Sequence, residues 1–374
     1  MEQGISPPPL SLYIHIPFCL SKCGYCSFFS VPFSIVELQN YLKHLHKELD
    51  LYQDLLQKPL HTLYFGGGTP SLLTPLQLAE ICQSVNLSPQ AEVTLEINPI
   101  QLTPEFLQGL SKTRINRLSL GVQSMNNDDL LWLNRRHKAE QIPQKIKLCR
   151  DYGYNNISLD LMYGLPKSDL PGLQRNIQAY LNLQPEHISC YLLALDEDCS
   201  LYKDMALLPD DDTQAEQYDT ICNSLKEAGY AQYEISNFAL VGKESQHNLT
   251  YWHSKNYLAI GASAAGWISP CRYHNPSGLA EYYACVWQGE RFPDATIQNK
   301  QRIWEDYLMM GLRLLEGINI NSFQKLFEVN LPDFYGAKIK RLMHLGLLEQ
   351  KEERLRLTQQ ALFISNAVIA ELIL

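Results

Sequence analysis

The sequence predicts an α/β fold built from parallel β-strands that alternate with helices, followed by a small helical domain. Over the first two-thirds of the 374 residues, short apolar segments rich in Tyr, Ile, Val and Leu alternate with amphipathic segments. Several apolar segments leave no polar face for water, which is typical of strands that are covered on both sides. With 45% hydrophobic residues, the chain has ample apolar material for the core of one large or two modest domains.

Six segments are the expected strands, and helices with recognisable starts separate them. The expected strands span residues 12–16, 62–65, 92–97, 117–122, 157–162 and 187–195. Thr74 and Thr103 each stand before a proline, which suits a capping side chain followed by the first helical position. This alternation implies parallel βαβ units with right-handed crossovers. Six units are enough for a barrel or a partial barrel, and a doubly wound open sheet is the alternative.

We expect three parts along the chain. Residues 1–230 form the core barrel, and residues 231–299 form a less regular extension that packs on it and carries a motif of its own. Residues 300–374 change to three helical segments and a strand pair, which is typical of a winged-helix-like domain, with Gly346 as the cap of its third helix. The mixed charge of this domain favours packing or partner docking over DNA binding.

Composition and charge exclude several classes of protein. The 31 Lys and Arg against 40 Asp and Glu give a net charge of −9, which argues against a nucleic-acid partner. No run of about 18 apolar residues is present, so we expect no integral membrane segment. The first ten residues lack the plan of a signal peptide, and ten cysteines are too sparse for a small disulfide scaffold. The expected compartment is the reducing cytoplasm, where cysteines are buried or bind metal.

Three cysteines stand close together directly after the first expected strand. Cys19, Cys23 and Cys26 are separated by three and two residues, and Gly24 permits the tight turn that would bring their thiols to one centre. Three thiolates suit three irons of a [4Fe–4S] cluster and leave the fourth iron open for chemistry. The alternatives are a zinc site, which usually takes a second pair of ligands, or chance spacing.

The spacing C-x3-C-x2-C in the loop after the first strand resembles the signature of the radical S-adenosylmethionine superfamily. The resemblance implies a partial (β/α)6 barrel and an S-adenosylmethionine that chelates the open iron through its amino and carboxylate groups. It also implies that reduction of the cluster cleaves this cofactor to give a 5′-deoxyadenosyl radical.

Polar and glycine-rich positions follow several of the expected strands. Three glycines at 66–68 allow close backbone approach to a ligand, and Asp160 lies in an apolar strand, where a carboxylate is costly unless it is paired or bound to a ligand. With these positions, the sequence resembles the coproporphyrinogen-oxidase-like branch of the superfamily over nearly the whole chain. In that branch, the positions that match contacts to the cluster-bound S-adenosylmethionine are Tyr13, Gly67, Glu96 and Ala265. The positions that match contacts to a second S-adenosylmethionine are Tyr25, Gly68, Thr69, Gln123, Arg135, Asp160 and Ala194.

Two features separate this chain from the oxidases of that branch. The oxidases carry a further cysteine two residues after the third, where this chain has Phe28, and they have a longer segment before the first cysteine than the 18 residues here. The hexapeptide at 247–252 instead resembles the H-N-x-x-Y-W signature of HemW-type heme chaperones. The expected heme-binding residues are therefore His247, Asn248, Tyr251 and Trp252.

The residue types of the hexapeptide are also suited to binding a tetrapyrrole. An imidazole can ligate iron, and Tyr251 and Trp252 offer flat faces for stacking. A lone histidine beside aromatic residues is more often a hydrogen-bonded structural residue, and His253, Cys271 and His274 are nearby alternatives as the ligand.

The resemblance implies a heme chaperone with a [4Fe–4S] cluster and S-adenosylmethionine, which passes heme to an acceptor such as a respiratory cytochrome. Such an acceptor would bring the protein to the membrane, and because the sequence contains no anchor, we expect any membrane association to be transient. The enzymatic alternative is oxygen-independent coproporphyrinogen III oxidation, by radical decarboxylation of propionates. A third alternative is an interaction protein stabilised by zinc.

Overall fold

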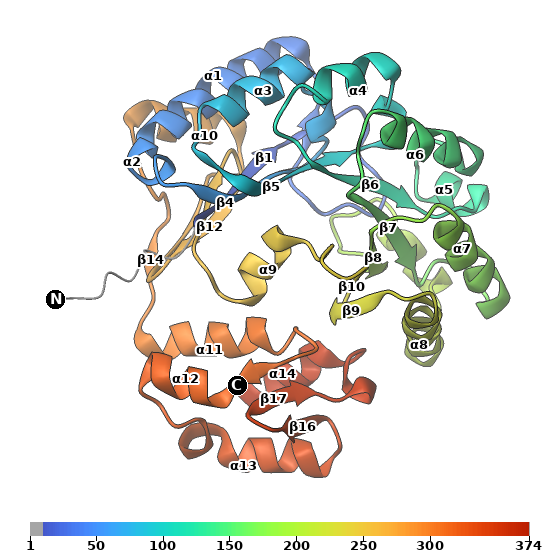
Figure 1. The fold of residues 1–374 in the computed structure, drawn as a ribbon, viewed down its shortest axis with the longest axis vertical. Helices are drawn as coiled ribbons and strands as arrows, with labels where there is room; N and C mark the ends of the chain where they lie inside the picture. Colours follow the sequence, from blue (N-terminus) through green and yellow to red (C-terminus); the bar gives the residue numbers. More distant parts are fainter. Residues whose placement is uncertain (1–9, 374) are drawn as a thin grey trace.

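The computed structural model describes residues 10–373, and its main feature is one large curved sheet (Figure 1). The strands of this sheet are β1 (Leu10–Ile16), β4 (Leu60–Gly67), β5 (Leu87–Ile97), β6 (Arg117–Gln123), β7 (Ile157–Tyr163), β8 (His187–Leu192), β9 (Ala231–Glu234), β10 (Asn237–Ala239), β11 (Tyr257–Ile260), β12 (Ala265–Ile268), β13 (Cys271–His274) and β14 (Thr296–Ile297). Their order is β14-β13-β12-β11-β1-β4-β5-β6-β7-β8-β10-β9, so the sheet stays open.

The middle of the sheet is parallel and its two ends are antiparallel. From β11 through β1, β4, β5, β6 and β7 to β8, each strand pairs in parallel with the next. The alternation of parallel strands and helices predicted from the sequence is therefore confirmed. Strands of the segment 231–299 add antiparallel pairs at both edges, with β9 and β10 at one and β12 to β14 at the other. This segment is thus an integral part of the sheet.

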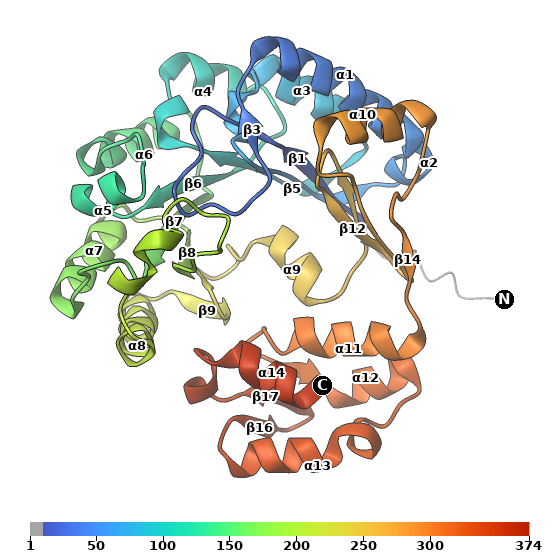
Figure 2. The same ribbon diagram turned by 180° about the vertical axis from the view of Figure 1, so that it is seen from behind.

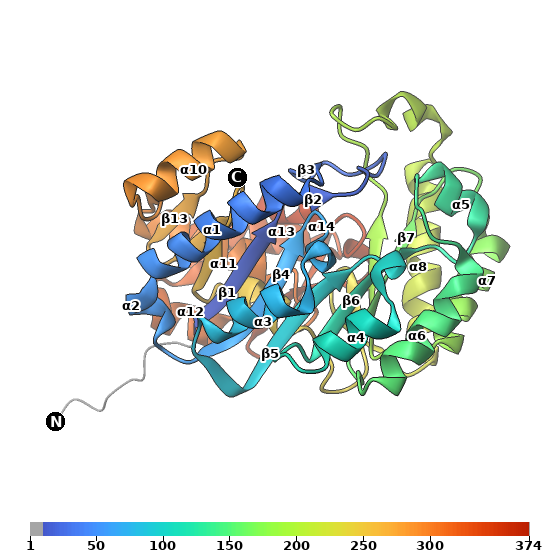
Figure 3. The same ribbon diagram turned by 90° about the horizontal axis from the view of Figure 1, so that it is seen from above.

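Helices cover the convex face of the sheet (Figures 1 and 3). They are α1 (Ile35–Leu51), α2 (Gln53–Leu56), α3 (Pro75–Gln83), α4 (Pro104–Leu110), α5 (Asn127–Trp132), α6 (Ile142–Asp151), α7 (Leu170–Asn182), α8 (Asp211–Glu227) and α10 (Leu279–Gln288). The caps expected for two of them are present, because Thr74 and Thr103 accept the backbone N–H groups of Gln77 and Phe106.

The two faces of the parallel strands differ in chemistry. Fully buried aliphatic side chains such as Leu63 and Leu95 belong to the core under the helices. The alternate positions carry buried polar groups, because successive side chains of a strand point to opposite faces. This second set includes Thr62, Glu92, Thr94, Arg117, Ser119, Ser158, His187 and Ser189. The concave side of the sheet is therefore a buried polar surface.

One short helix, α9 (Gln246–Trp252), lies on the concave side between the sheet and the C-terminal domain (Figures 1 and 2). The Glu92 carboxylate on β5 accepts the backbone N–H groups of Gln246 and His247 in the first turn of α9. The Thr62 hydroxyl lies 2.6 Å from Nδ1 of His247. The polar face of the sheet therefore holds this helix in place.

The C-terminal domain packs below α9 as a separate small layer. It consists of α11 (Lys300–Gly311), β15 (Ile318–Asn319), α12 (Ile320–Phe327), α13 (Leu331–His344), β16 (Leu348–Lys351), β17 (Arg354–Leu357) and α14 (Ser365–Ile373). Its small sheet has the order β15-β17-β16. Gly346 has φ of 72° directly after the helix α13, which is the left-handed conformation expected of a helix C-cap glycine. The sequence did not indicate β15 or α14.

Two expectations concern residues that lie partly or wholly outside the described range. Both the lack of a signal peptide and the short segment before the first cysteine depend on residues 1–9, which the structure does not describe. Within residues 10–373, no helix combines the length and the apolar character that crossing a membrane requires.

Candidate functional site

The three predicted cluster cysteines lie in one loop at the carboxyl end of the sheet. The loop runs between β2 (Phe18–Cys19) and β3 (Val31–Pro32), which pair in parallel with each other. Cys19, Cys23 and Cys26 are half-buried free thiols, and the N–H of Cys26 donates to the carbonyl of Cys23. Burial raises the pKa of the Cys26 thiol. The structure therefore brings three unpaired sulfurs into one compact loop.

Hydrogen-bond donors face two of these sulfurs. The Arg135 guanidinium lies 3.2 Å from Sγ of Cys23, and the Thr69 hydroxyl lies 3.5 Å from Sγ of Cys19. A Cβ atom at Gly68 would lie 3.0 Å from the same Cys19 sulfur, so the loop after β4 approaches as closely as glycine allows. Donors around anionic sulfur are typical of iron–sulfur sites. The residues present therefore fit a [4Fe–4S] cluster held by three thiolates.

Within residues 10–373, no group of three or more His, Cys, Asp or Glu side chains converges on a single metal ion. A cubane cluster spreads its ligands over different irons, so its cysteines need not meet at one point. When bound, such a cluster would supply the electron for radical chemistry on S-adenosylmethionine.

The loop after β8 packs against the cysteine loop, a contact that sequence patterns did not indicate. Both project from the same end of the sheet (Figure 3). The Cys199 thiol lies 3.1 Å from the carbonyl oxygen of Tyr25, and the N–H of Leu201 donates to the carbonyl of Gly24. A Cβ at Gly24 would lie 2.7 Å from Cγ of Leu201. Gly24 therefore permits the close packing against Leu201, whereas its φ lies outside the left-handed region, so the turn itself does not require glycine.

The four positions predicted to contact a cluster-bound S-adenosylmethionine come from three neighbouring strands and β12. Tyr13 on β1 stacks on Tyr64 of β4, with ring centroids 6.1 Å apart, and the Tyr64 hydroxyl donates to Glu96 at 2.8 Å. Burial raises the pKa of Glu96 to about 7. Gly67 ends β4 with φ of 111°, and Ala265 begins β12 as an exposed residue. A neutral or half-charged carboxyl at position 96 suits a ligand amine or hydroxyl.

Most positions predicted for a second S-adenosylmethionine gather around Arg135. The guanidinium bonds the Gly121 carbonyl at 2.6 Å as well as the Cys23 sulfur. Burial raises the pKa of Asp160 to about 7, while the charges of Arg117 and Arg135 oppose this shift. The remaining positions are Tyr25, Gly68 and Thr69 in the two loops just described, Gln123 at the end of β6 with φ of 71°, and the exposed Ala194 after β8.

The predicted heme motif forms the helix α9, and its members have different surroundings. His247 is 1% exposed, and its Nε2 lies 2.8 Å from the Tyr251 hydroxyl while its Nδ1 faces Thr62. Burial lowers the pKa of His247 to about 3, so its ring is neutral. The backbone N–H of Asn248 donates to the capping side chain of Ser245. Trp252 ends the helix, with the Arg313 guanidinium 4.9 Å from its ring centroid.

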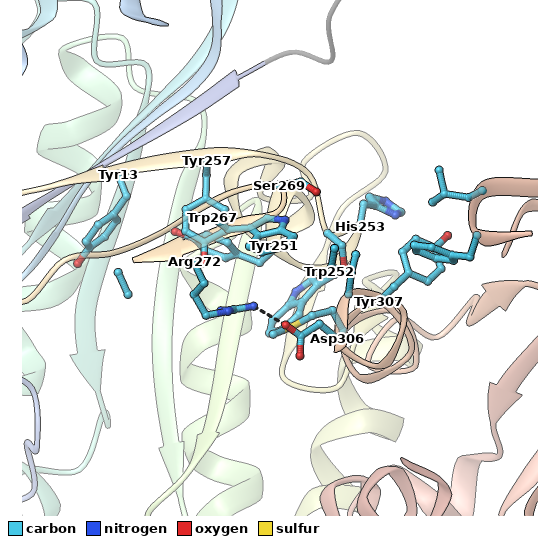
Figure 4. A pocket seen from close by; sticks show the side chains of 16 residues that line it. Tyr13, Tyr251, Trp252, His253, Tyr257, Trp267, Ser269, Arg272, Asp306 and Tyr307 are labelled. Atoms are coloured by element: carbon cyan, nitrogen blue, oxygen red, sulfur yellow. Dashed lines mark hydrogen bonds and ion pairs between the residues drawn. The ribbon is translucent and has the colours of Figure 1, made fainter. Parts of the chain in front are cut away.

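A cavity of about 580 Å³ lies between α9, the β12–β13 hairpin and the C-terminal domain (Figure 4). Most of its lining is apolar or aromatic. The lining residues are Tyr13, Tyr251, Trp252, His253, Ser254, Tyr257, Ala265, Trp267, Ser269, Arg272, Ile303, Asp306, Tyr307, Met310, Leu326 and Phe327. Two of them, Arg272 on β13 and Asp306 on α11, form an ion pair at 2.8 Å across the domain boundary.

This cavity joins two sets of residues that the sequence suggested separately. Tyr13 and Ala265 belong to the predicted S-adenosylmethionine site, and Tyr251 and Trp252 belong to the predicted heme motif. Tyr13 lies toward one end in Figure 4, and His253 and Tyr307 lie toward the other. Sequence patterns did not indicate the contributions of Trp267, Arg272 or the C-terminal domain, because these residues meet the motif only in the folded chain.

The class of protein follows from this combination of fold and cysteine loop. Residues 13–172 match the model of the radical SAM superfamily, and residues 298–364 match that of the HemN C-terminal domain. The fold is similar to the solved structure of coproporphyrinogen III oxidase (HemN) from Escherichia coli, with a TM-score of 0.87 over 98% of this chain and 90% of that one, at 22% sequence identity. The partial radical-SAM barrel with its additional C-terminal domain is thereby confirmed.

Relatives that match over most of their length identify the family of this chain more narrowly. The heme chaperone HemW of Lactococcus lactis subsp. lactis (strain IL1403) is 32% identical over 98% of both chains. The heme chaperone HemW of Bacillus subtilis (strain 168) is 34% identical over 96% of this chain and 97% of the relative. Radical S-adenosyl methionine domain-containing protein 1, mitochondrial, of Danio rerio is 32% identical over 97% of this chain and 87% of the relative. The chain belongs to the HemW family of radical SAM proteins.

Proposed function

We propose that this protein binds heme in the cavity beneath α9 and transfers it to an acceptor protein. The observation that carries the proposal is that Tyr251 and Trp252 of the H-N-x-x-Y-W motif open into one aromatic cavity shared with the C-terminal domain. The names of the HemW relatives agree with it. The acceptor is expected to be a heme protein such as a respiratory cytochrome.

The chemistry of the cavity suits a flat, mostly apolar ligand with charged substituents. Its volume of about 580 Å³ is in the usual range for sites that bury a cofactor-sized molecule. Trp252, Tyr257 and Trp267 supply aromatic surface for stacking on a tetrapyrrole. Arg272 supplies guanidinium donors for a propionate, since its ion pair with Asp306 uses only some of them.

Tyr13 and Ala265, two of the positions predicted for S-adenosylmethionine, line this cavity. We propose that the cluster loop holds a [4Fe–4S] cluster with Cys19, Cys23 and Cys26 as ligands, and that the glycine loop and Glu96 hold S-adenosylmethionine.

The experiment that tests the proposal offers two ligands to one preparation. The protein is reconstituted anaerobically with iron and sulfide; one sample then receives hemin, and another receives coproporphyrinogen III together with S-adenosylmethionine and a reductant for the cluster. We expect stoichiometric hemin binding, seen as a shifted Soret band, and its transfer to an apo-cytochrome b on mixing. Formation of protoporphyrinogen IX at rates of ordinary turnover would favour the oxidase instead, and no hemin binding would refute the proposal.

A further inference from the structure

The structure distinguishes two histidines that lie six residues apart on and after α9, and only one of them faces the cavity. On the basis of the proposed heme site, we propose that His253 supplies the axial ligand to heme iron, while His247 positions the motif. His253 is the C-cap residue of α9 and lines the cavity, whereas the cavity lining does not include His247.

His247 has no free nitrogen in its folded surroundings. Nδ1 lies 2.6 Å from the Thr62 hydroxyl and Nε2 lies 2.8 Å from the Tyr251 hydroxyl. The ring also stacks on Tyr64, with centroids 4.9 Å apart. To ligate iron, this imidazole would have to break one of two buried hydrogen bonds and leave its partner unsatisfied. Its contacts instead fix the ring of Tyr251 at the cavity wall.

His253 presents the opposite situation. The His253 ring forms no hydrogen bond with any of residues 10–373, and the residue is half-buried. At 3.6 residues per turn, six residues place two side chains roughly 120° apart around a helix, so His253 leaves the buried face that His247 occupies. Figure 4 shows its ring at the end of the cavity near Tyr307 of the C-terminal domain.

The charge state of His253 also suits a ligand. Burial lowers the pKa of its imidazole, and the neighbouring charges of Lys255 and Arg354 act in the same direction while Glu316 opposes them. The ring is therefore neutral at pH 7, with a nitrogen lone pair free for a metal. The residues on either side add a second sign of a missing ligand, because Nε1 of Trp252 and Oγ of Ser254 are buried and have no hydrogen-bond partner within residues 10–373.

The other possible ligands in the cavity are less suited to ferric iron. Burial raises the pKa values of the phenols of Tyr13, Tyr251 and Tyr257, which keeps them protonated and neutral. The thioether of Met310 is a soft ligand and a weak acceptor. His253 is the one imidazole in the cavity lining, so ferric hemin is the probe that tests it.

The test compares three variants of the reconstituted full-length protein with ferric hemin. His253→Gly removes the ligand at a helix end that tolerates glycine, His247→Gln keeps a hydrogen-bonding side chain at the buried position, and His274→Ala is the control for an exposed histidine outside the cavity lining. Binding is followed by Soret titration, and the iron ligand by electron paramagnetic resonance and resonance Raman spectroscopy. Circular dichroism and iron content show whether each variant is folded.

We expect His253→Gly to lose the imidazole signature and about tenfold or more in hemin affinity, and added imidazole to restore the signature. His247→Gln and His274→Ala should keep the signature of the unchanged protein. An unchanged spectrum in His253→Gly, or loss of the signature in His247→Gln alone, would overturn the assignment of the ligand while leaving the heme site standing. If the unchanged protein binds no hemin, the proposed function itself fails.

Discussion

Arg135 is the residue that ties the cluster loop to the sheet, since one guanidinium contacts both the Cys23 sulfur and the Gly121 carbonyl. Its positive charge lies 3.2 Å from Sγ of Cys23, so it would stabilise the more negative, reduced state of a bound cluster. We expect Arg135→Met to lower the reduction potential of the cluster by roughly 40 mV, which corresponds to about 1 kcal/mol for a one-electron couple.

The measurement is a redox titration of the reconstituted cluster followed by electron paramagnetic resonance. Arg136→Met is the matched control, because it removes the same charge from the neighbouring position. The Arg136 side chain is exposed and makes no contact with Cys23 like that of Arg135. Equal potentials in the two variants would show that the contact with Cys23 has no electrostatic effect on the cluster.

At the scale of single residues, sequence spacing was sufficient to identify the three cysteines and the glycines after β4 as candidate site residues. It was not sufficient to predict which side chains contact them. Arg135 lies 112 residues from Cys23, and Tyr64 lies 32 residues from Glu96, so only the folded sheet shows which donor meets which acceptor. The same holds for the histidines, since His247 and His253 differ in burial rather than in any local sequence pattern.

At the scale of secondary-structure elements, Glu48 joins α1 to the loop after β11 and to α10. Its carboxylate is 3% exposed and accepts from the Gly261 N–H at 2.9 Å, the Tyr282 hydroxyl at 2.7 Å and Asn275 at 2.6 Å. Burial outweighs these donors and raises its pKa from 4.5 to about 7. Ionisation of Glu48 is therefore less favourable in the folded protein than in the unfolded chain.

This shift predicts the sign of a pH dependence. The contribution of Glu48 is fully present below pH 4.5, where both states are protonated, and about 3 kcal/mol of it is lost as the pH rises to 7. Glu48→Gln cannot titrate, so the free energy of unfolding of the unchanged protein minus that of the variant should fall by about 2.5 kcal/mol between pH 5 and pH 8. Glu96 and Asp160 have raised pKa values as well, but they are present in both proteins and cancel in this difference.

Urea denaturation under anaerobic conditions at several pH values measures this difference. A pH-independent difference would mean that the carboxyl of Glu48 is already charged at little cost in the folded state. Tyr283→Phe, which removes a hydroxyl that bonds Glu37 at the surface end of the same helix pair, should leave the pH dependence unchanged.

The sequence predicted most central elements but not the character of the concave face. Apolar residues in each strand indicated burial on both sides, and this is confirmed for the core under the helices. The alternate polar residues, such as Thr62 and Arg117, are buried too, and α9 packs on this face with His247 against Thr62. A pattern within one strand cannot show that a distant helix will return to cover its polar face.

At the scale of the whole molecule, the boundary between barrel and C-terminal domain is where the proposed ligand site lies. The C-terminal domain contributes Ile303, Asp306, Tyr307, Met310, Leu326 and Phe327 to the cavity. The sequence favoured packing or partner docking as the role of this domain, and the structure adds that the domain forms one wall of the cavity. Heme release would then require this wall to move or the acceptor to reach the open side of the cavity.

Leu326 tests the role of this wall, because it lines the cavity yet its side chain is 63% exposed and contributes little to folding. Leu326→Asp removes apolar contact surface and places a charged carboxylate in the cavity wall. We expect hemin affinity to fall about tenfold, which is about 1.4 kcal/mol, less than the value of a fully buried leucine. Leu345→Asp is the control, since that leucine is 52% exposed on the same domain and does not line the cavity. Equal affinities for Leu326→Asp and the unchanged protein would place the heme away from the C-terminal domain, and equal losses in both variants would point to a general effect of charge on the domain.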